Sequence, residues 1–320
     1  MRYSRREIGK LALAALPAAA LLERPLAVLG QSKPNSVVNG VNLGTITYSY
    51  RGMPDQRAEA ILRYVVDSGI SQIEFMGSPV EAFAGAPQMP RGALAGRGAP
   101  STPHQQTIQR EHATKLRAWR TSVSMDRFKA LRSMFNEAGV SIYAWKQLAT
   151  DMTDEEIEYV FNVAEALGNT HVTLELTDDV AQLKRLGQFA EKKKIYVAYH
   201  THLQGNLNAF DRAFAASKAN MANVDLGHYV AAGGDPLVFL NRFHDRIASF
   251  HLKDRTTPAN GQKNLPWGTG DTPLVQILQT VRKNRWKMPA TIELEYEVPT
   301  GSDAVREVVK CLEFCKRALA

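Results

Sequence analysis

The sequence predicts a (β/α)8 barrel, also called a TIM barrel, over residues 36–320. Eight short runs rich in β-branched and other apolar residues alternate with helical patterns from Val41 to the end of the chain. One continuous series of eight β/α units is typical of a closed parallel barrel. A dinucleotide-binding fold is not indicated, because no Gly-x-Gly-x-x-Gly follows a predicted strand. A length of 320 residues with 44% hydrophobic residues is sufficient for one large core.

The predicted strands and helices alternate along the chain. The strands are Val41–Tyr50, Ile70–Gly77, Val140–Lys146, Thr170–Leu176, Ile195–His202, Met221–His228, Ile247–Asp254 and Ala290–Glu297. The helices are Asp55–Ser68, Met125–Ala138, Thr153–Leu167, Asp178–Lys193, Leu207–Ala219, Pro236–His244, Thr272–Lys283 and Ser302–Leu319. Thr153 is a suitable N-cap followed by an acidic first turn, and Gly168 is a suitable C-cap, so this helix has both boundary signals.

Residues 79–123 interrupt the alternation after the second predicted strand. They include the Gly-, Pro- and Ala-rich stretch GAPQMPRGALAGRGAPSTP. Loops that follow strands in such barrels lie at the C-terminal end of the barrel, where active sites form. The segment is therefore predicted to be a long insertion over that face, as a lid or an oligomer contact.

Residues 1–35 are predicted to be a signal peptide and linker. Arg5 and Arg6 precede the short apolar stretch LALAALPAAALL, an arrangement that resembles a twin-arginine export signal. The apolar stretch is too short to span a bilayer comfortably. We therefore expect an exported, periplasmic protein without a stable membrane span after signal removal, or a membrane-anchored one if the signal is retained.

Composition excludes several classes of protein. The net charge is +7, but residues 1–24 carry +3 of it, and no later basic run is interleaved with aromatic residues. Nucleic acid is therefore not an expected partner. The sequence leaves open whether the chain forms a homo-oligomer. Two cysteines, Cys311 and Cys315, exclude a disulfide scaffold or a Cys-rich zinc module, and their spacing places both on one buried helix face.

Five consecutive predicted strands end in polar residues that share one face. Strand residues alternate between the barrel interior and the helix layer, so the apolar residues identify the outward set and their neighbours point inward. The inward residues near the strand ends are Thr173 and Glu175, His200 and His202, Asp225, Ser249, His251 and Lys253, and Thr291, Glu293 and Glu295. Several carboxylates buried together need a compensating cation. Imidazoles and carboxylates that converge on one point therefore predict a divalent-metal site.

Three of these strand ends carry motifs of a known family. Asp225-Leu-Gly-His228, His251-Leu-Lys-Asp254 and Ile292-Glu293-Leu-Glu295 resemble the xylose isomerase-like TIM-barrel superfamily, which includes sugar phosphate isomerases/epimerases, ketose 3-epimerases, inosose dehydratases and endonuclease IV. The resemblance covers residues 38–318.

The resemblance implies that Asp225, His251 and Glu293 bind a divalent ion, Mn²⁺, Mg²⁺ or Zn²⁺. The family's fourth ligand is usually a Glu at an earlier strand end, often the fifth, where this chain has His200 and His202. Glu175, His200 and His202 are the alternatives, with Glu175 favoured.

The other inward residues are candidates for catalysis and substrate binding. Glu293, Lys253 and His202 are the candidate catalytic residues, because a carboxylate or imidazole can move a proton and an ammonium can stabilise an enolate oxygen. The candidate substrate-binding residues are His200, His228, Glu295 and Trp267, the last in a Trp-Gly-Thr-Gly-Asp loop that resembles the family's glycine-rich loop. Glu74 could reach the site from the second strand or pair with a neighbouring base.

The family resemblance leads to three hypotheses for function. The first is a metal-dependent isomerase or epimerase that acts on a ketose or keto-sugar through an enediolate. The second is a lyase or dehydratase that uses the same intermediate on a 3-keto-glycoside or an inosose-like substrate. The third is a non-catalytic sugar-binding barrel. A three-metal DNA-repair endonuclease is disfavoured, because the second and third strands have no inward histidine.

Overall fold

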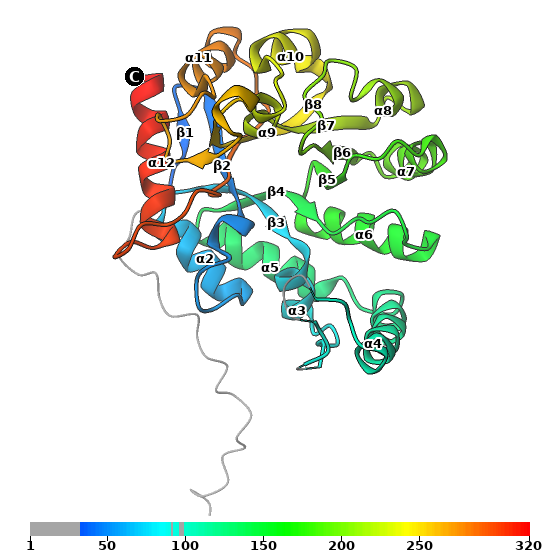
Figure 1. Cartoon of the computed structure of the whole chain (residues 1–320). Helices are drawn as coiled ribbons and strands as arrows, with labels where there is room; N and C mark the ends of the chain where they lie inside the picture. The colour runs from blue at the N-terminus through cyan, green and yellow to red at the C-terminus, as the bar shows by residue number, and fades with distance from the viewer. Residues whose placement is uncertain (1–32, 91, 96–98) are drawn as a thin grey trace, which may run out of the picture. The chain divides into compact units, whose positions relative to one another are not determined.

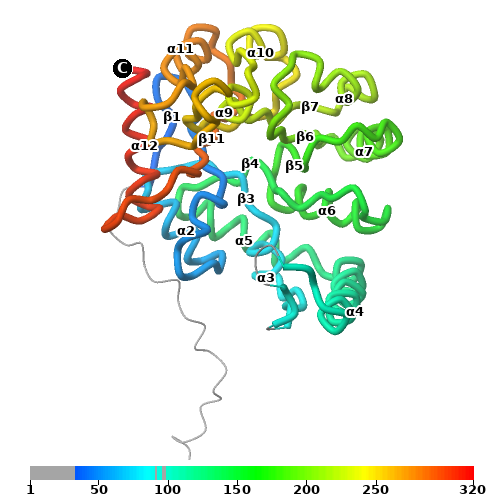
Figure 2. Tube along the Cα trace, in the orientation of Figure 1, coloured from blue at the N-terminus to red at the C-terminus, as the bar shows by residue number. Residues whose placement is uncertain are grey.

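Eight parallel strands close into a barrel in the computed structural model, which describes residues 33–90, 92–95 and 99–320 (Figures 1 and 2). The barrel strands are β2 (Val41–Ile46), β3 (Gln72–Met76), β4 (Ser141–Lys146), β5 (His171–Glu175), β6 (Tyr196–His200), β7 (Asn220–Asp225), β8 (Ile247–Leu252) and β11 (Ala290–Ile292). Each strand pairs with the next in chain order, and β11 pairs with both β8 and β2, which closes the ring. The predicted TIM barrel is confirmed. Residues 1–32, with the predicted signal, lie outside the described residues.

Helices surround the ring of strands (Figure 1). They are α2 (Ala58–Asp67), α3 (Gly77–Ala84), α4 (Pro103–Arg120), α5 (Asp126–Glu137), α6 (Asp154–Leu167), α7 (Val180–Lys193), α8 (Asp211–Ala216), α9 (Leu226–Ala231), α10 (Pro236–Phe243), α11 (Leu274–Asn284) and α12 (Ala304–Leu319). The predicted boundaries of α6 are confirmed within a residue. Thr153 and Glu156 form a capping box at its start, and Gly168 ends it in the left-handed conformation.

Seven of the eight barrel strands end earlier than predicted, and at two of these ends side chains take the place of the strand ladder. The strand expected to run to His228 ends at Asp225, whose carboxylate caps α9 by accepting a hydrogen bond from the backbone N–H of His228. The strand expected to run to Glu297 ends at Ile292. The Ile292 carbonyl oxygen accepts hydrogen bonds from the hydroxyls of Thr45 and Ser49. The Ser49 Oγ atom in turn accepts a hydrogen bond from the Leu294 N–H.

The insertion after the second barrel strand contains the long helix α4, which packs beside the outer helices. Arg120 forms ion pairs with Glu81 of α3 at 2.8 Å and with Glu156 of α6 at 3.0 Å. Trp119 packs edge-on against Tyr159, so an apolar contact supports the same interface. The prediction that the insertion covers the C-terminal face of the barrel is therefore wrong for α4, which lies at the side of the barrel (Figure 1).

Polar side chains fill much of the barrel interior, while the apolar core lies between strands and helices. Inside, Tyr143 Oη and Thr291 Oγ1 are 2.7 Å apart, and His171 Nε2 lies 2.8 Å from Ser249 Oγ. These contacts confirm the predicted alternation of inward and outward residues. Cys311 and Cys315 are free and buried on α12, as expected. Among the described residues, no helix combines the length and apolar character that a membrane span requires.

Candidate metal centre

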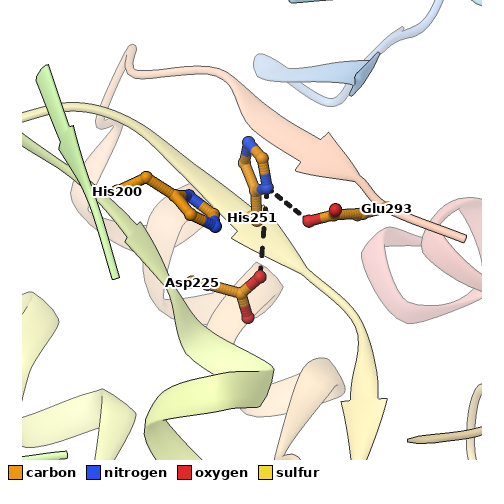
Figure 3. Close-up of side chains that lie close together, drawn as sticks. All are labelled: His200, Asp225, His251 and Glu293. Atoms are coloured by element: carbon orange, nitrogen blue, oxygen red, sulfur yellow. Dashed lines mark hydrogen bonds and ion pairs between the residues drawn. The ribbon is translucent and has the colours of Figure 1, made fainter. Parts of the chain in front are cut away.

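Four buried side chains converge at the C-terminal ends of neighbouring strands (Figure 3). His200 ends β6, Asp225 ends β7, His251 lies near the end of β8, and Glu293 directly follows β11. Each residue offers one nitrogen or oxygen ligand atom, and these atoms lie within 4.8 Å of one another. Three of the four were predicted metal ligands, and His200 was both a predicted substrate-binding residue and one of the three alternatives for the fourth ligand.

His251 lies between two carboxylates. Its Nδ1 is 2.6 Å from Glu293 Oε2, and its Nε2 is 2.8 Å from Glu74 Oε2. With a carboxylate at each nitrogen, both nitrogens act as donors in this structure. Burial disfavours the charged ring, but the carboxylates of Glu74 and Glu293 outweigh it and raise the pKa of His251 to about 10.

Lys253 supplies a second positive charge. Its Nζ lies 2.9 Å from Asp225 Oδ2, 3.1 Å from Glu293 Oε2 and 2.7 Å from Glu295 Oε2. Burial opposes the ammonium form, yet these carboxylates keep the pKa of Lys253 above its usual value. Lys253 and His251 hold the pKa of Glu293 well below its usual value despite burial, so Glu293 is ionised.

His200 is neutral and presents one nitrogen to the group. Its Nδ1 is 2.8 Å from Asn223 Oδ1, which accepts the ring proton and leaves Nε2 with a free lone pair. Burial and the nearby positive charge of His251 keep the pKa of His200 well below its usual value. A neutral imidazole with a lone pair is the form that binds metal ions.

The residues present fit a divalent metal ion. Asp225 Oδ2 is buried and accepts no well-formed hydrogen bond among the described residues, although Lys253 Nζ lies 2.9 Å away. Two imidazole nitrogens and two carboxylate oxygens form a mixed donor set that suits Zn²⁺ or Mn²⁺ better than Mg²⁺, which prefers oxygen. His200, Asp225, His251 and Glu293 are therefore the residues that would hold the ion.

Glu175 and His202 lie outside this group, nearer to solvent. Their side chains are about half exposed, 52% for Glu175 and 55% for His202, and His202 Nδ1 lies 3.3 Å from Glu175 Oε2. Glu175 also pairs with Lys146 Nζ at 2.9 Å. The structure therefore does not bring Glu175 to the other three predicted ligands, and His200 takes the fourth place. Glu175, His200 and His202 form a second set of neighbouring ligand atoms.

His228 lies next to His202, with ring centroids 4.9 Å apart, and Glu295 contacts Lys253. His228 Nε2 is 3.6 Å from Glu295 Oε2, and its Nδ1 accepts a hydrogen bond from the Arg255 guanidinium. Burial and the charges of Lys253 and Arg255 lower the pKa of His228 to about 2, so this ring is neutral. We call Lys146, Glu175, His202, His228 and Glu295 the mouth residues.

The loop that holds Trp267 is attached to the barrel by Asp254. The Asp254 carboxylate accepts four backbone hydrogen bonds, from Gly268 at 2.7 Å, Thr269 at 3.1 Å, Gly270 at 2.9 Å and Thr272 at 3.2 Å. Trp267 itself packs edge-on against Phe314 of α12, with ring centroids 5.8 Å apart. The structure thus places this predicted substrate-binding side chain against the last helix.

Sequence reasoning gave no role to Lys146 and left that of Glu74 open. Glu74 is fully buried on β3 and contacts His251 directly, and Lys146 ends β4 beside Glu175. A charged residue inside an apolar strand was the available signal for Glu74. Lys146 also follows the apolar strand Ile142–Trp145 at its C-terminal end, the position at which barrel enzymes place functional residues.

Comparisons with known proteins agree with this fold. A family model described as xylose isomerase-like TIM barrel matches residues 155–315, just over half of the chain. The inosose dehydratase of Lacticaseibacillus casei is 34% identical over 77 residues, which are 22% of this chain and 26% of that protein. The chain thus matches about a quarter of the length of its curated relatives.

Solved structures share the whole barrel at low sequence identity. A xylose isomerase domain protein from Alicyclobacillus acidocaldarius aligns with a TM-score of 0.61 and 15% identity, covering 87% of this chain and 99% of that one. The 3-keto-D-glucoside 4-epimerase of E. coli aligns with a TM-score of 0.58 and 12% identity, covering 86% and 100%. These likenesses establish the shared fold, and the family model that matches residues 155–315 shows that the chain belongs to the xylose isomerase-like TIM-barrel family.

Proposed function

We propose that this protein is a divalent-metal-dependent enzyme that isomerises or epimerises a ketose or keto-sugar through an enediolate. The observation that carries the proposal is the buried group of His200, Asp225, His251 and Glu293 at the C-terminal end of the barrel, with Lys253 in contact with two of its carboxylates. This is the end at which TIM-barrel enzymes assemble their active sites.

The residues around the group suit proton transfer next to a carbonyl. A bound divalent ion would supply positive charge beside the carbonyl and hydroxyl oxygens, which acidifies the C–H bond between them. Glu293 is ionised and can accept that proton. Lys253 is charged and can donate a hydrogen bond to the oxygen that gains negative charge. His202 and Glu175, which are half exposed, are our candidates to exchange a proton with a substrate hydroxyl.

The mouth residues favour a carbohydrate. They present two carboxylates, two imidazoles and an ammonium, which together offer hydrogen-bond donors and acceptors to several hydroxyls. The export signal proposed for residues 1–35 favours a free sugar or glycoside over a sugar phosphate. Mn²⁺ or Zn²⁺ is the ion we propose, because two of the four ligand residues are histidines.

A dehydratase or lyase is the second candidate, and two observations favour it. The curated relatives that match 77 residues of this chain are inosose dehydratases. His200, whose Nδ1 proton is bound to Asn223, stands at the strand end where the family usually has a glutamate, so that carboxylate is not available as an acid or base. Epimerisation requires a proton to be returned to the opposite face of the carbon, whereas an elimination does not. The substrate would then be a 3-keto-glycoside or an inosose-like ring, and the enediolate would expel a β-substituent.

One screen tests the proposal and separates its two forms. Purified protein is incubated with free ketoses, 3-keto-glycosides and inososes, with and without a chelator, and the products are identified by NMR. We expect turnover that the chelator abolishes and Mn²⁺ or Zn²⁺ restores. An epimer or isomer supports the first form, and loss of water or of an aglycone supports the second. Sugar binding without turnover, unaffected by the chelator, would indicate a non-catalytic barrel and contradict the proposal.

A further inference from the structure

Glu74 is a buried carboxylate that lies behind the candidate metal centre. It is on β3, with no exposed surface, whereas the four residues of the metal group come from β6, β7, β8 and the segment after β11. Its Oε1 accepts a hydrogen bond from Thr173 Oγ1 at 2.7 Å. Its Oε2 faces His251 Nε2 at 2.8 Å and Asn223 Nδ2 at 3.2 Å. A charge buried this deeply is retained only with such partners.

The contact between Glu74 and His251 determines which nitrogen of His251 is available to a metal ion. The Nδ1 atom faces the group, 2.6 Å from Glu293 Oε2 and 3.9 Å from Asp225 Oδ2. The Nε2 atom faces away, toward Glu74. A carboxylate that accepts the Nε2 proton keeps that proton in place, orients the ring and makes Nδ1 a better electron-pair donor.

The contact between Glu74 and Asn223 determines in the same way which nitrogen of His200 is available. The Asn223 amide nitrogen donates to Glu74 Oε2 and to Ser249 Oγ, the latter at 2.6 Å, so its oxygen is left to face His200 Nδ1 at 2.8 Å. The reverse orientation would place the amide oxygen against the Glu74 carboxylate, where no hydrogen bond can form. The Glu74 charge thereby sets the Asn223 orientation, which holds the His200 proton on Nδ1 and leaves Nε2 for the ion.

We propose that Glu74 is a positioning residue for both histidine ligands, acting on His251 directly and on His200 through Asn223. The inference rests on the metal centre of the proposed function and deepens it. Glu74 is not one of the four residues whose ligand atoms converge. It sets the tautomers of two ligands that come from separate strands, β6 and β8.

Metal affinity of the full-length protein tests the proposal without any substrate. Glu74→Gln keeps the size of the side chain and an oxygen for His251, but removes the charge. We expect Mn²⁺, titrated into the metal-free protein by calorimetry, to bind about 10- to 100-fold more weakly, the usual loss for such outer partners. In the Co²⁺-loaded protein the visible absorption bands should shift or weaken, because ring orientation changes the ligand field.

Glu307→Gln is the matched control. Glu307 is also buried and also has three side-chain partners, Tyr296, Ser302 and Lys310, but it lies on α12 outside the metal group. It should retain the Mn²⁺ affinity and the Co²⁺ spectrum of the unmutated protein. Glu74→Asp keeps the charge on a shorter side chain and should lose less affinity than Glu74→Gln, which provides a second test if the amide variant folds poorly.

Unchanged affinity in Glu74→Gln, or equal losses in Glu74→Gln and Glu307→Gln, would overturn the proposal. A protein that binds no divalent ion would overturn it together with the metal-dependent reaction. Tight Mn²⁺ binding that weakens in Glu74→Gln, without turnover of any sugar, would support the role of Glu74 and contradict only the proposed reaction.

Discussion

Position 227 has room for glycine alone. A Cβ atom built on Gly227 would lie 2.3 Å from Lys253 Cγ and 2.6 Å from the Lys253 carbonyl oxygen. Gly227→Ala should therefore push α9 away from the end of β8 and lower the free energy of unfolding by about 1–3 kcal/mol, a typical cost of overpacking. Denaturant unfolding measures the change. Gly52→Ala is the control, since nothing lies within 4 Å of its Cβ position. Equal stability of both variants would contradict the predicted collision.

Glu293 and Glu295 lie two residues apart but differ in their contacts. Glu293 is a member of the metal group, whereas Glu295 lies outside it and contacts Lys253. We expect Glu293→Gln to lose at least about 100-fold in Mn²⁺ affinity, more than outer partners usually cost, and nearly all turnover. Glu295→Gln should retain the ion and lose about tenfold in affinity or less. Calorimetry and rate measurements on both variants provide the check, and the reverse order of effects would exclude Glu293 as a ligand.

Alternation along the strands predicted the inward residues, but it could not rank them by depth. Glu175 and His200 are both inward, and they are register partners on β5 and β6. Glu175 is nevertheless half exposed and paired with Lys146, whereas His200 is buried in the metal group. The difference depends on the tilt and stagger of the strands around the barrel, which local sequence does not encode.

At the scale of elements, helix α4 is held by a carboxylate that serves two helices. Glu156 caps α6 through Thr153 and pairs with Arg117 and Arg120 of α4 at 3.0 Å. Burial opposes ionisation, but the Thr153 N–H and the two arginines hold the Glu156 pKa below its usual value of 4.5. Ionised Glu156 therefore stabilises the folded protein at any pH above the pKa that this residue has in the unfolded chain. This stabilisation is lost as the pH falls through the lower pKa of Glu156 in the folded protein.

Acid should consequently loosen α4 before the barrel unfolds. We expect hydrogen exchange in residues 103–120, corrected for its intrinsic pH dependence, to rise below about pH 4.5 in the unmutated protein. Glu156→Gln should show fast exchange already at neutral pH and no acid step. Glu155→Gln, an exposed neighbour, should behave like the unmutated protein. If the rise in exchange at low pH persists in Glu156→Gln, a group other than Glu156 causes it.

Element boundaries were predictable where local signals act and not where distant residues intervene. The capping box and Gly168 fixed α6 because all of these groups lie within the helix or beside it. The strand that ends at Ile292 was predicted too long, because its ladder is ended by hydroxyls from residues 45 and 49, at the other end of the chain. The position of α4 likewise depends on its pairing with Glu81 and Glu156, which a Gly- and Pro-rich composition does not reveal.

For the molecule as a whole, the export of the chain is a separate prediction. The Arg5-Arg6 pair and the apolar stretch after it resemble a twin-arginine signal. Arg5→Lys combined with Arg6→Lys should retain the protein in the cytoplasm, because this type of signal is read by a receptor that distinguishes the two side chains. Cell fractionation with immunodetection measures the distribution. Arg2→Lys with Arg24→Lys, outside the pair, should leave export unchanged, and unchanged export of the first variant would contradict the signal.

The Asp254 carboxylate has a consequence for the speed of binding. Four backbone N–H groups of residues 268–272 donate to it without any ligand, so this loop is ordered in advance. A loop that is already fixed has little conformational entropy left to lose when a substrate arrives. Association with a substrate that contacts this loop should then proceed in one step whose rate rises linearly with substrate concentration, without the plateau that a slow loop closure produces. Asp254→Ala would release the loop and introduce that plateau in stopped-flow measurements.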